Sequence, residues 1–304
     1  MKLNIRNETS TLKSVIVGIA DSNGGIPESS NVYDPKSRKN ISLGTYPIES
    51  DMVFELNNFV SIIKSHNVEV LRPKIIKNYN QIFSRDIGFV IGDKFVKSNI
   101  LPLRSMEIDA INFILEKINP NSIITLPEDA HIEGGDVILC DNKIFVGAYV
   151  KDDYSTFITA RTNLKAIEFL QEIFPDKEFI LLELNKSNID PKYNILHLDC
   201  CFQPIGKSYA IIHKEGFSNK SQLNNLIDFF GRNNCFFIDA DEMSEMTANI
   251  FSIDSNTVIS DSSFHRLNNW MKNKGFNVEI ISFREIAKQE GLFRCVTLPL
   301  NRIS

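Results

Sequence analysis

Short hydrophobic runs recur in pairs along the chain, and a turn dipeptide joins the two runs of each pair. Four such pairs are present, with Gly-Asp, Asp-Asn, Gly-Lys and Ser-Asn as the joining dipeptides. Two β-rich runs around a two-residue turn are typical of a β-hairpin. The pairs begin after Arg85-Asp86, Glu133-Gly134-Gly135-Asp136, His197-Leu198-Asp199 and Asn249. Because a repeat places its equivalent residues at equivalent points of the fold, we expect these starts to converge if the units surround an axis.

Between the hairpins the pattern changes to apolar residues at helical spacing, followed by one more strand. Residues 51–64 carry Val53, Leu56, Val60 and Ile63 on one helical face, and residues 68–73 then resemble a strand that ends at a proline. The same order recurs in residues 107–118 and 122–127, 162–174 and 179–184, 222–230 and 235–239, and 264–273 and 278–283.

The two ends of the chain carry one hydrophobic run each, in residues 12–20 and 295–300. Both are half-units that are able to close a ring. The pattern therefore predicts five ββαβ units, one of them assembled from both ends, because ring closure removes exposed strand edges. No low-complexity linker divides the chain, so we expect a single catalytic α/β domain spanning residues 1–304.

Composition limits the class of protein. With 43% hydrophobic and 23% charged residues among 304, the chain fits a globular protein with a substantial core. The net charge of −5, without a basic block, argues against nucleic acid as a partner. No apolar run is long enough to span a membrane and the start lacks a signal-peptide core, so we expect no membrane partner and a cytoplasmic location. The five cysteines follow no framework spacing and are expected to be reduced.

Residues 21–46 form the longest irregular stretch and are rich in Gly, Ser, Asn and Pro. A loop of this length inside a compact protein is typical of a lid or a binding loop. A surface excursion without function is the alternative, and the sequence leaves both open.

Acidic residues and a histidine gather at the hairpin starts. The paired glycines of Glu133-Gly134-Gly135-Asp136 allow unusual backbone angles and close approach, and acids on both sides are suited to a cation. His197 and Asp199 are expected on one face of a strand, because side chains two residues apart point the same way. A histidine beside a carboxylate suits proton transfer.

A metal site is discounted. The adjacent Cys200 and Cys201 would point to opposite faces of a strand, and no CxxC or HxxxH pattern accompanies them.

Cys295 is the cysteine with a distinctive neighbour, because Arg294 precedes it at the start of a predicted strand. A neighbouring positive charge favours the nucleophilic thiolate form. A buried core cysteine is the alternative interpretation.

Taken in order, these elements resemble the arginine deiminase and amidinotransferase superfamily, whose fold is a five-bladed α/β propeller, the pentein fold, around a central active-site channel. The matching segments span most of the chain: Phe83-Ser84-Arg85-Asp86, Glu133-Gly134-Gly135-Asp136, Ala160-Arg161-Thr162-Asn163, His197-Leu198-Asp199 and Arg294-Cys295-Val296-Thr297-Leu298-Pro299-Leu300.

The resemblance implies a reaction that needs no metal or organic cofactor, and a role for each matching residue. Cys295 would attack the central carbon of a guanidinium group, and Glu133 and His197 would share the proton transfers. Asp86 and Asp199 would bind the guanidinium nitrogens, since carboxylates at fixed positions bind a planar cation through charge-assisted hydrogen bonds. Arg104 and Arg161 resemble the family positions that hold the carboxylate of an amino-acid substrate.

The second nucleophile divides the family. Water gives hydrolases of the deiminase or dimethylarginine-hydrolase type, and an amine gives amidinotransferases. We favour a hydrolase of arginine or a related guanidino compound, because the Glu-Gly-Gly-Asp and Arg-Thr-Asn segments look more like the hydrolases. Two further hypotheses are a guanidino-compound binding protein without turnover and a cysteine peptidase that uses Cys295, His197 and Asp199. The oligomeric state stays open, a homo-oligomer included.

Overall fold

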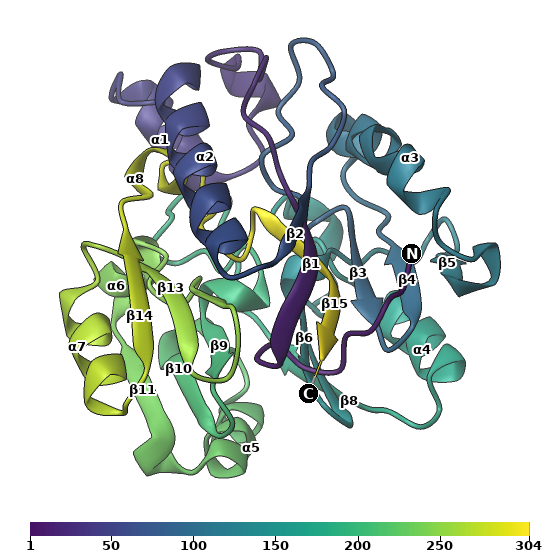
Figure 1. Ribbon diagram of the computed structural model, residues 1–304, viewed down its shortest axis with the longest axis vertical. Coiled ribbons are helices and arrows are strands. Elements are labelled where there is room, and N and C mark those ends of the chain that lie inside the picture. The colour runs from purple at the N-terminus through teal and green to yellow at the C-terminus, as the bar shows by residue number, and fades with distance from the viewer. Residues whose placement is uncertain (304) are drawn as a thin grey trace.

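The computed structural model describes residues 1–303, so that residue 304, the last of the predicted domain, lies outside the described residues. Its strands form five separate three-stranded sheets, which surround the middle of the molecule (Figure 1). In each sheet the central strand is antiparallel to one neighbour and parallel to the other. The predicted five-bladed α/β propeller is thereby confirmed.

Four sheets follow the chain order of hairpin, helix and strand. They comprise β3 (Gly88–Ile91), β4 (Lys94–Lys97) and β5 (Ile123–Thr125); β6 (Val137–Cys140), β7 (Lys143–Ala148) and β8 (Glu178–Glu183); β9 (Phe202–Ile205), β10 (Tyr209–His213) and β11 (Cys235–Ile238); and β12 (Phe251–Ser252), β13 (Thr257–Asp261) and β14 (Asn277–Ile281).

The fifth sheet joins the two ends of the chain. Strand β1 (Thr11–Val17) lies between β15 (Thr297–Ile303), its antiparallel partner, and β2 (Glu69–Leu71), its parallel partner. In Figure 1 the purple strand β1 is beside the yellow strand β15. The ring is therefore closed by backbone hydrogen bonds between the two ends of the sequence, as the two half-units predict.

Helices connect the strands within the units. The longest is α2 (Glu49–Ser65), whose buried face includes Phe59, packed against the rings of Phe251, Phe283 and Phe293 at centroid distances of 5.3 to 6.0 Å. The others are α1 (Pro35–Ser42), α3 (Asn112–Leu115), α4 (Leu164–Ile173), α5 (Lys220–Phe230), α6 (Ala240–Ser244), α7 (His265–Asn273) and α8 (Arg284–Ala287). Among the described residues no helix has the length and apolar character needed to cross a membrane.

The predicted helix over residues 107–118 is wrong in type. The segment begins in the 3-10 turns Pro102–Glu107 and Asp109–Ile111, and α3 has only four residues. Ile108, Ile111 and Ile114 are three residues apart, a spacing that fits the three-residue turn of a 3-10 helix. Residues 21–46 are likewise less irregular than expected, because they contain α1. Asp34 caps this helix by accepting a hydrogen bond from the Ser37 amide at 2.6 Å, and Pro35 takes its first position.

Candidate active site

The site is built from the tight turns that precede the hairpin strands. Residues 84–87 form such a turn, as do the 3-10 turns Gly134–Asp136 and Leu198–Cys200 and the turn of residues 293–296. The Arg85 amide donates to the Cys295 carbonyl at 3.0 Å, which joins the first of these turns to the last. Asp86, Glu133, His197 and Cys295 are all buried, each at most 4% exposed as a residue. The hairpin starts thus meet in the buried middle of the ring.

His197 lies between two carboxylates. Its Nε2 atom is 2.7 Å from Glu133 Oε2, and its Nδ1 atom is 3.7 Å from Asp86 Oδ1. Burial alone would lower the pKa of His197, but the carboxylates of Asp86, Glu133 and Asp136 raise it from 6.5 to about 9. His197 is therefore protonated at neutral pH and is able to act as an acid.

The glycines of the second hairpin start make room for the histidine. A Cβ atom on Gly135 would lie 2.6 Å from His197 Cγ, and one on Gly134 would lie 2.2 Å from the Arg85 carbonyl oxygen. Both positions therefore exclude any larger residue. Asp136, expected to receive a cation, instead accepts hydrogen bonds from the Thr162 hydroxyl and the Leu198 amide. It fixes the turn that carries His197.

The predicted strand at His197-Leu198-Asp199 is wrong. His197 is extended, but Leu198–Cys200 is a 3-10 turn, because the segment has to bend into the hairpin that begins at Phe202. The two side chains consequently reach different partners. His197 faces Glu133 and Asp86, whereas the Asp199 carboxylate lies 3.8 Å from Cys295 Sγ and 2.9 Å from Arg294 Nη1. Asp199 therefore belongs to the surroundings of the cysteine.

Asn249, at the start of the remaining hairpin, contacts both the backbone amide and the sulfur of Cys295. Its side-chain oxygen accepts hydrogen bonds from the amides of Arg294 and Cys295, at 2.9 and 3.2 Å. Its Nδ2 atom is 3.2 Å from Cys295 Sγ, within hydrogen-bonding distance of the sulfur. An N–H donor at this place stabilises a thiolate more than a thiol. The sequence identified Asn249 only as a supporting residue, through its place in the repeat.

The Cys295 thiol is a weak acid in this environment. Burial raises the pKa of Cys295 well above its usual value, and the carboxylates of Asp199 and Asp86 raise it further. Arg294 lowers the pKa of Cys295, as predicted, but burial and the two aspartates outweigh it. The guanidinium of Arg294 donates to Asp199 and Glu8. A cation placed between the two aspartates would reverse part of this effect.

Arg294 forms ion pairs with two buried carboxylates. Its side chain is fully buried and binds Glu8 at 3.0 Å and Asp199 at 2.9 Å, and it also donates to the Val137 carbonyl at 2.7 Å. These partners come from the N-terminal segment, the turn after His197 and the first residue of β6. Because of Arg294 the pKa of Glu8 is lowered to about 2 although burial opposes this.

The two arginines assigned to a substrate carboxylate are bound to acids of the protein. Arg104 Nη1 lies 2.7 Å from Asp86 Oδ2, while its Nε and Nη2 atoms bind both oxygens of Glu107 at 2.6 and 2.9 Å. Arg161 Nη1 lies 3.2 Å from both oxygens of Glu133. Sequence reasoning missed Glu107, although it follows Arg104 by three residues, a spacing that favours such a pair.

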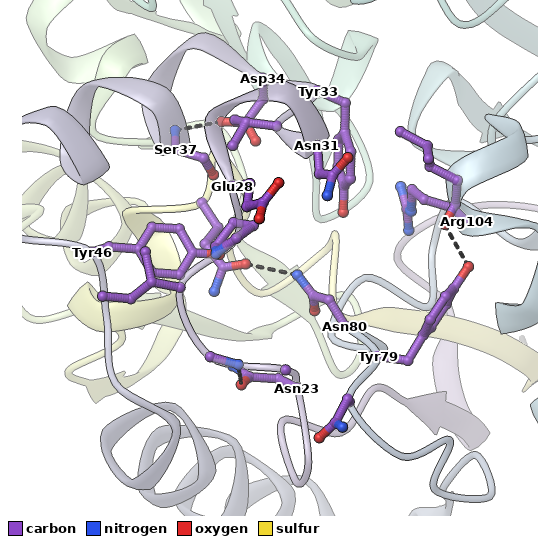
Figure 2. A pocket seen from close by; sticks show the side chains of 18 of the residues that line it. Asn23, Glu28, Asn31, Tyr33, Asp34, Ser37, Tyr46, Tyr79, Asn80 and Arg104 are labelled. Carbon is purple, nitrogen blue, oxygen red and sulfur yellow. Dashed lines mark hydrogen bonds between the residues drawn. The ribbon is translucent and has the colours of Figure 1, made fainter.

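A cavity of about 470 Å³ adjoins this cluster and is covered by the segment of residues 21–46. Its lining includes Tyr33, Asp34 and Tyr46 of that segment together with Arg104 and Glu107. Figure 2 shows Tyr33 beside Arg104, whose guanidinium carbon lies 5.6 Å from the centre of the Tyr33 ring. The segment therefore lines a cavity beside the site, and its role as a lid or binding loop stays a prediction.

Three side chains offer ligand atoms at metal-binding distance. The atoms of Asp86, Glu133 and His197 lie within 4.8 Å of one another. A protonated histidine has no lone pair for a metal, and both carboxylates already bind arginines. The chemistry of this trio thus fits proton transfer and cation binding better than it fits a metal ion.

Known proteins resemble this chain in sequence. The sequence profile of N,N dimethylarginine dimethylhydrolase, eukaryotic, matches residues 29–302. The uncharacterized protein YkgA of Bacillus subtilis (strain 168) is 32% identical over 251 residues, which cover 81% of this chain and 79% of that protein.

Two solved structures share the fold. The amidinotransferase SxtG of the saxitoxin biosynthetic pathway, from Microseira wollei, superposes with a TM-score of 0.76 at 18% identity and covers 99% of this chain and 98% of its own. The N-terminal domain of ArgZ, a cyanobacterial arginine dihydrolase bound to product, superposes with a TM-score of 0.78 at 19% identity and covers 95% and 97%.

Proposed function

Since this chain belongs to the N,N-dimethylarginine dimethylhydrolase family and is thereby an enzyme that modifies guanidino groups, we propose that it hydrolyses arginine or a related guanidino compound through a covalent intermediate on Cys295. The observation that carries the proposal is the placement of Asp86 Oδ1, a carboxylate oxygen without a hydrogen-bond partner, in a buried centre with His197, Asp199 and Cys295. A buried acceptor of this kind costs free energy until a donor binds it, and a guanidinium supplies N–H donors together with a positive charge.

Substrate binding and activation of the nucleophile are coupled in this proposal. Asp86 and Asp199 raise the pKa of Cys295 in the free enzyme. A guanidinium bound between them neutralises their charges and lowers that pKa, so the thiolate forms where its target already lies. Asn249 Nδ2 then donates to the thiolate sulfur.

His197 serves both halves of the reaction. The Cys295 thiolate attacks the guanidinium carbon and forms a tetrahedral intermediate. His197, protonated at neutral pH, donates its proton to the leaving amine, and a C–N bond breaks to leave an amidino-thioether on Cys295. The neutral His197 next takes a proton from water, which attacks the same carbon. The C–S bond then breaks, the hydroxyl group of the tetrahedral intermediate gives its proton to the departing sulfur, and the ureido product leaves with the Cys295 thiol restored.

An amine as second nucleophile would make the enzyme an amidinotransferase. The family match supports water, whereas two of the similar structures are those of amidinotransferases. Other similar structures are those of an arginine dihydrolase and of AgrE in complex with ornithine and NAD+, which supports arginine-like ligands. The assignment of Arg104 and Arg161 to the far end of the substrate stays a prediction.

Mass spectrometry of acid-quenched protein tests the proposal. After incubation with arginine, methylated arginines or agmatine, we expect an amidino adduct on Cys295 and release of ammonia or an amine without an added acceptor. Cys295→Ala should abolish both and retain ligand binding, while Cys235→Ala, at a half-buried cysteine outside the site, should retain activity. Product that forms only with glycine, ornithine or lysine present would show a transferase. No adduct and no product with any guanidine would refute the enzyme mechanism.

A further inference from the structure

We infer that a proton shared between the carboxyls of Asp34 and Glu290 attaches the covering segment to the loop that leads to Cys295, and that rising pH releases this attachment. The covering segment, residues 21–46, lines the cavity beside the site. The inference concerns how this segment is attached to the rest of the protein and does not rest on the proposed function.

The two carboxyls meet at the N-terminus of α1. Asp34 caps this helix by accepting a hydrogen bond from the Ser37 amide at 2.6 Å, drawn as a dashed line in Figure 2. Glu290, five residues before Cys295, accepts a hydrogen bond from the Lys36 amide at 3.3 Å. The side chains of Asp34 and Glu290 also hydrogen-bond each other. Because an ionised carboxylate has no donor, this contact requires a proton on one of the two.

Glu290 is also fixed from its own side. Its Oε1 atom accepts a hydrogen bond from Asn194 Nδ2 at 2.7 Å, and Asn194 precedes His197 by three residues. The backbone of Glu290 has a φ of 59°, which is strained for a residue other than glycine. A Cβ atom on the next residue, Gly291, would lie 2.2 Å from the Phe83 ring. The loop thus holds Glu290 in a strained, closely packed position to which α1 is attached.

Burial makes a second negative charge unfavourable at this place. Asp34 is 4% and Glu290 is 5% exposed. Burial and the neighbouring Asp34 raise the pKa of Glu290 to about 8, although the hydrogen bonds from Asn194 and the Lys36 amide oppose the rise. Burial raises the pKa of Asp34 as well, against the hydrogen bonds from Ser37. Two interacting carboxyls titrate as a pair, and this pair keeps one proton at neutral pH.

The nearby cations do not take over the role of the proton. Arg161 lowers the pKa of Asp34, but it is bound to Glu133 at 3.2 Å. Lys36 lowers the pKa of Glu290, yet the net shift is upward. Burial lowers the pKa of Lys36 itself, so detachment would take up a proton there. The titration of Lys36 would therefore favour the attached segment as the pH rises, which is the opposite of the inferred effect.

The other titratable groups near the pair or near Lys36 do not change this balance. Burial raises the pKa of Tyr33, of Tyr46 and of Cys200, so these side chains are neutral at neutral pH. Glu245 and Arg284, which face Lys36, pair with each other at 3.3 Å. The proton of the carboxyl pair is thus the group whose loss weakens the attachment near neutral pH.

The pH dependence follows from the change in proton binding. A freely exposed glutamic acid loses its proton around its ordinary pKa of 4.5, whereas Glu290 keeps it up to about pH 8. Between these values detachment releases one proton, so the ratio of detached to attached segment should rise about tenfold per pH unit. The attachment is strongest below pH 4.5 and weakest above about pH 8. The hydrogen bonds from Arg38 to the Asn188 carbonyl and from Asn40 to the Lys288 carbonyl carry no such dependence.

Hydrogen exchange of the α1 amides, followed by mass spectrometry between about pH 5.5 and 7.5 and corrected for the intrinsic exchange rate, tests the inference. The protection factor of the native protein should fall about tenfold per pH unit. Glu290→Gln keeps side-chain hydrogen bonds to its neighbours and removes the titrating proton, so its protection factor should not change with pH. Glu28→Gln, at an exposed acid of the same segment, should retain the native dependence.

Asp34→Asn provides a second test, because asparagine caps a helix and also donates to Glu290 without a shared proton. It too should abolish the pH dependence, including where Glu290→Gln fails to fold. The amides of α5, in another unit, should stay more protected than those of α1 at every pH.

Three results would overturn the inference. They are a native protection factor of α1 that does not change with pH, a dependence that persists in both variants, and equal protection of α1 and α5, which would mean that α1 exchanges only when the whole protein unfolds. Each of these results would leave the proposed function standing, because none of the measurements involves turnover.

Discussion

Replacing Glu133 by glutamine tests the proton chemistry of the site most directly. The change preserves the shape of the side chain but removes the carboxylate that lies 2.7 Å from His197 Nε2. It also leaves Arg161 without its acidic partner beside the imidazole. Both effects disfavour the protonated form of His197.

The magnitude follows from the remaining carboxylates. The pKa of His197 is about 9 in the native protein, against 6.5 for an isolated histidine. Asp86 stays at 3.7 Å and Asp136 stays buried nearby, so only part of the rise should be lost. An opposite charge at hydrogen-bonding distance typically moves a pKa by about 1 to 3 pH units, so we expect a fall of about 1 to 2 units. This corresponds to about 1.4 to 2.7 kcal/mol of differential stabilisation of the protonated form.

The assay is the pH dependence of kcat/KM with the best guanidine substrate. The rate of the native enzyme should fall above about pH 9, as His197 loses the proton that the leaving amine needs. In Glu133→Gln this fall should begin between about pH 7 and 8. Glu215→Gln serves as the control, because Glu215 lies 3.5 Å from a different histidine, His213, and should leave the profile unchanged.

Two results would contradict the reasoning. If the alkaline limbs of native enzyme and Glu133→Gln coincide, His197 does not set the limb and is not the acid of the reaction. If Glu133→Gln lowers the rate equally at all pH values, Glu133 acts on the transition state by some means other than the protonation of His197.

Three further predictions concern stability and the nucleophile. Arg294→Met removes the guanidinium that pairs with the buried carboxylates of Glu8 and Asp199. It should lower the free energy of unfolding, measured by urea titration, by about 3–5 kcal/mol. Arg266→Met, at an exposed ion pair, should lower it by about 0–1 kcal/mol. Asn249→Ala removes the N–H donor at Cys295 Sγ, so alkylation of the cysteine by iodoacetamide should require a higher pH than in the native protein. The free energy of unfolding should fall from about pH 5 to about pH 9. The reason is that the pKa is raised to about 9 for His197, to about 7 for Glu107 and to about 8 for Glu290, so the folded protein holds protons that the unfolded chain releases. For His197 this stabilisation is complete below pH 6.5 and lost through about pH 9, and a stability that is flat or rises over this range would contradict all three assignments.

Local patterns made most of the fold predictable. The hairpins around Gly92 and Gly206 follow from glycines that adopt positive φ angles of 58° at the turns, where other residues are strained. The helix and strand of each unit follow from hydrophobic spacing. The segment of residues 107–118 is the exception, because the three-residue spacing of its isoleucines is shared by helical and 3-10 structure.

The candidate site could be predicted as a set of residues but not as a set of contacts. The repeat indicates that Asp86, His197 and Cys295 converge, since each begins a unit. The direction in which Arg294 points depends on Glu8, which is 286 residues away in the sequence, and no local pattern connects them. The charge state of Cys295 depends on that direction and on burial, so it required the folded structure.

The pairing of β1 with β15 determines when, during folding, the nucleophile Cys295 reaches its position. Thr11 and Ile303 are partners in one sheet although nearly the whole sequence separates them, and Cys295 lies just before the strand that makes this contact. Contacts of such long sequence separation form late, because they carry a large entropy cost of closing the intervening loop. A ribosome-bound chain would therefore present the acidic turns before it could position the thiol. Enzymatic activity would then report ring closure, and a protein joined end to end and opened at a surface turn should gain folding speed at this step.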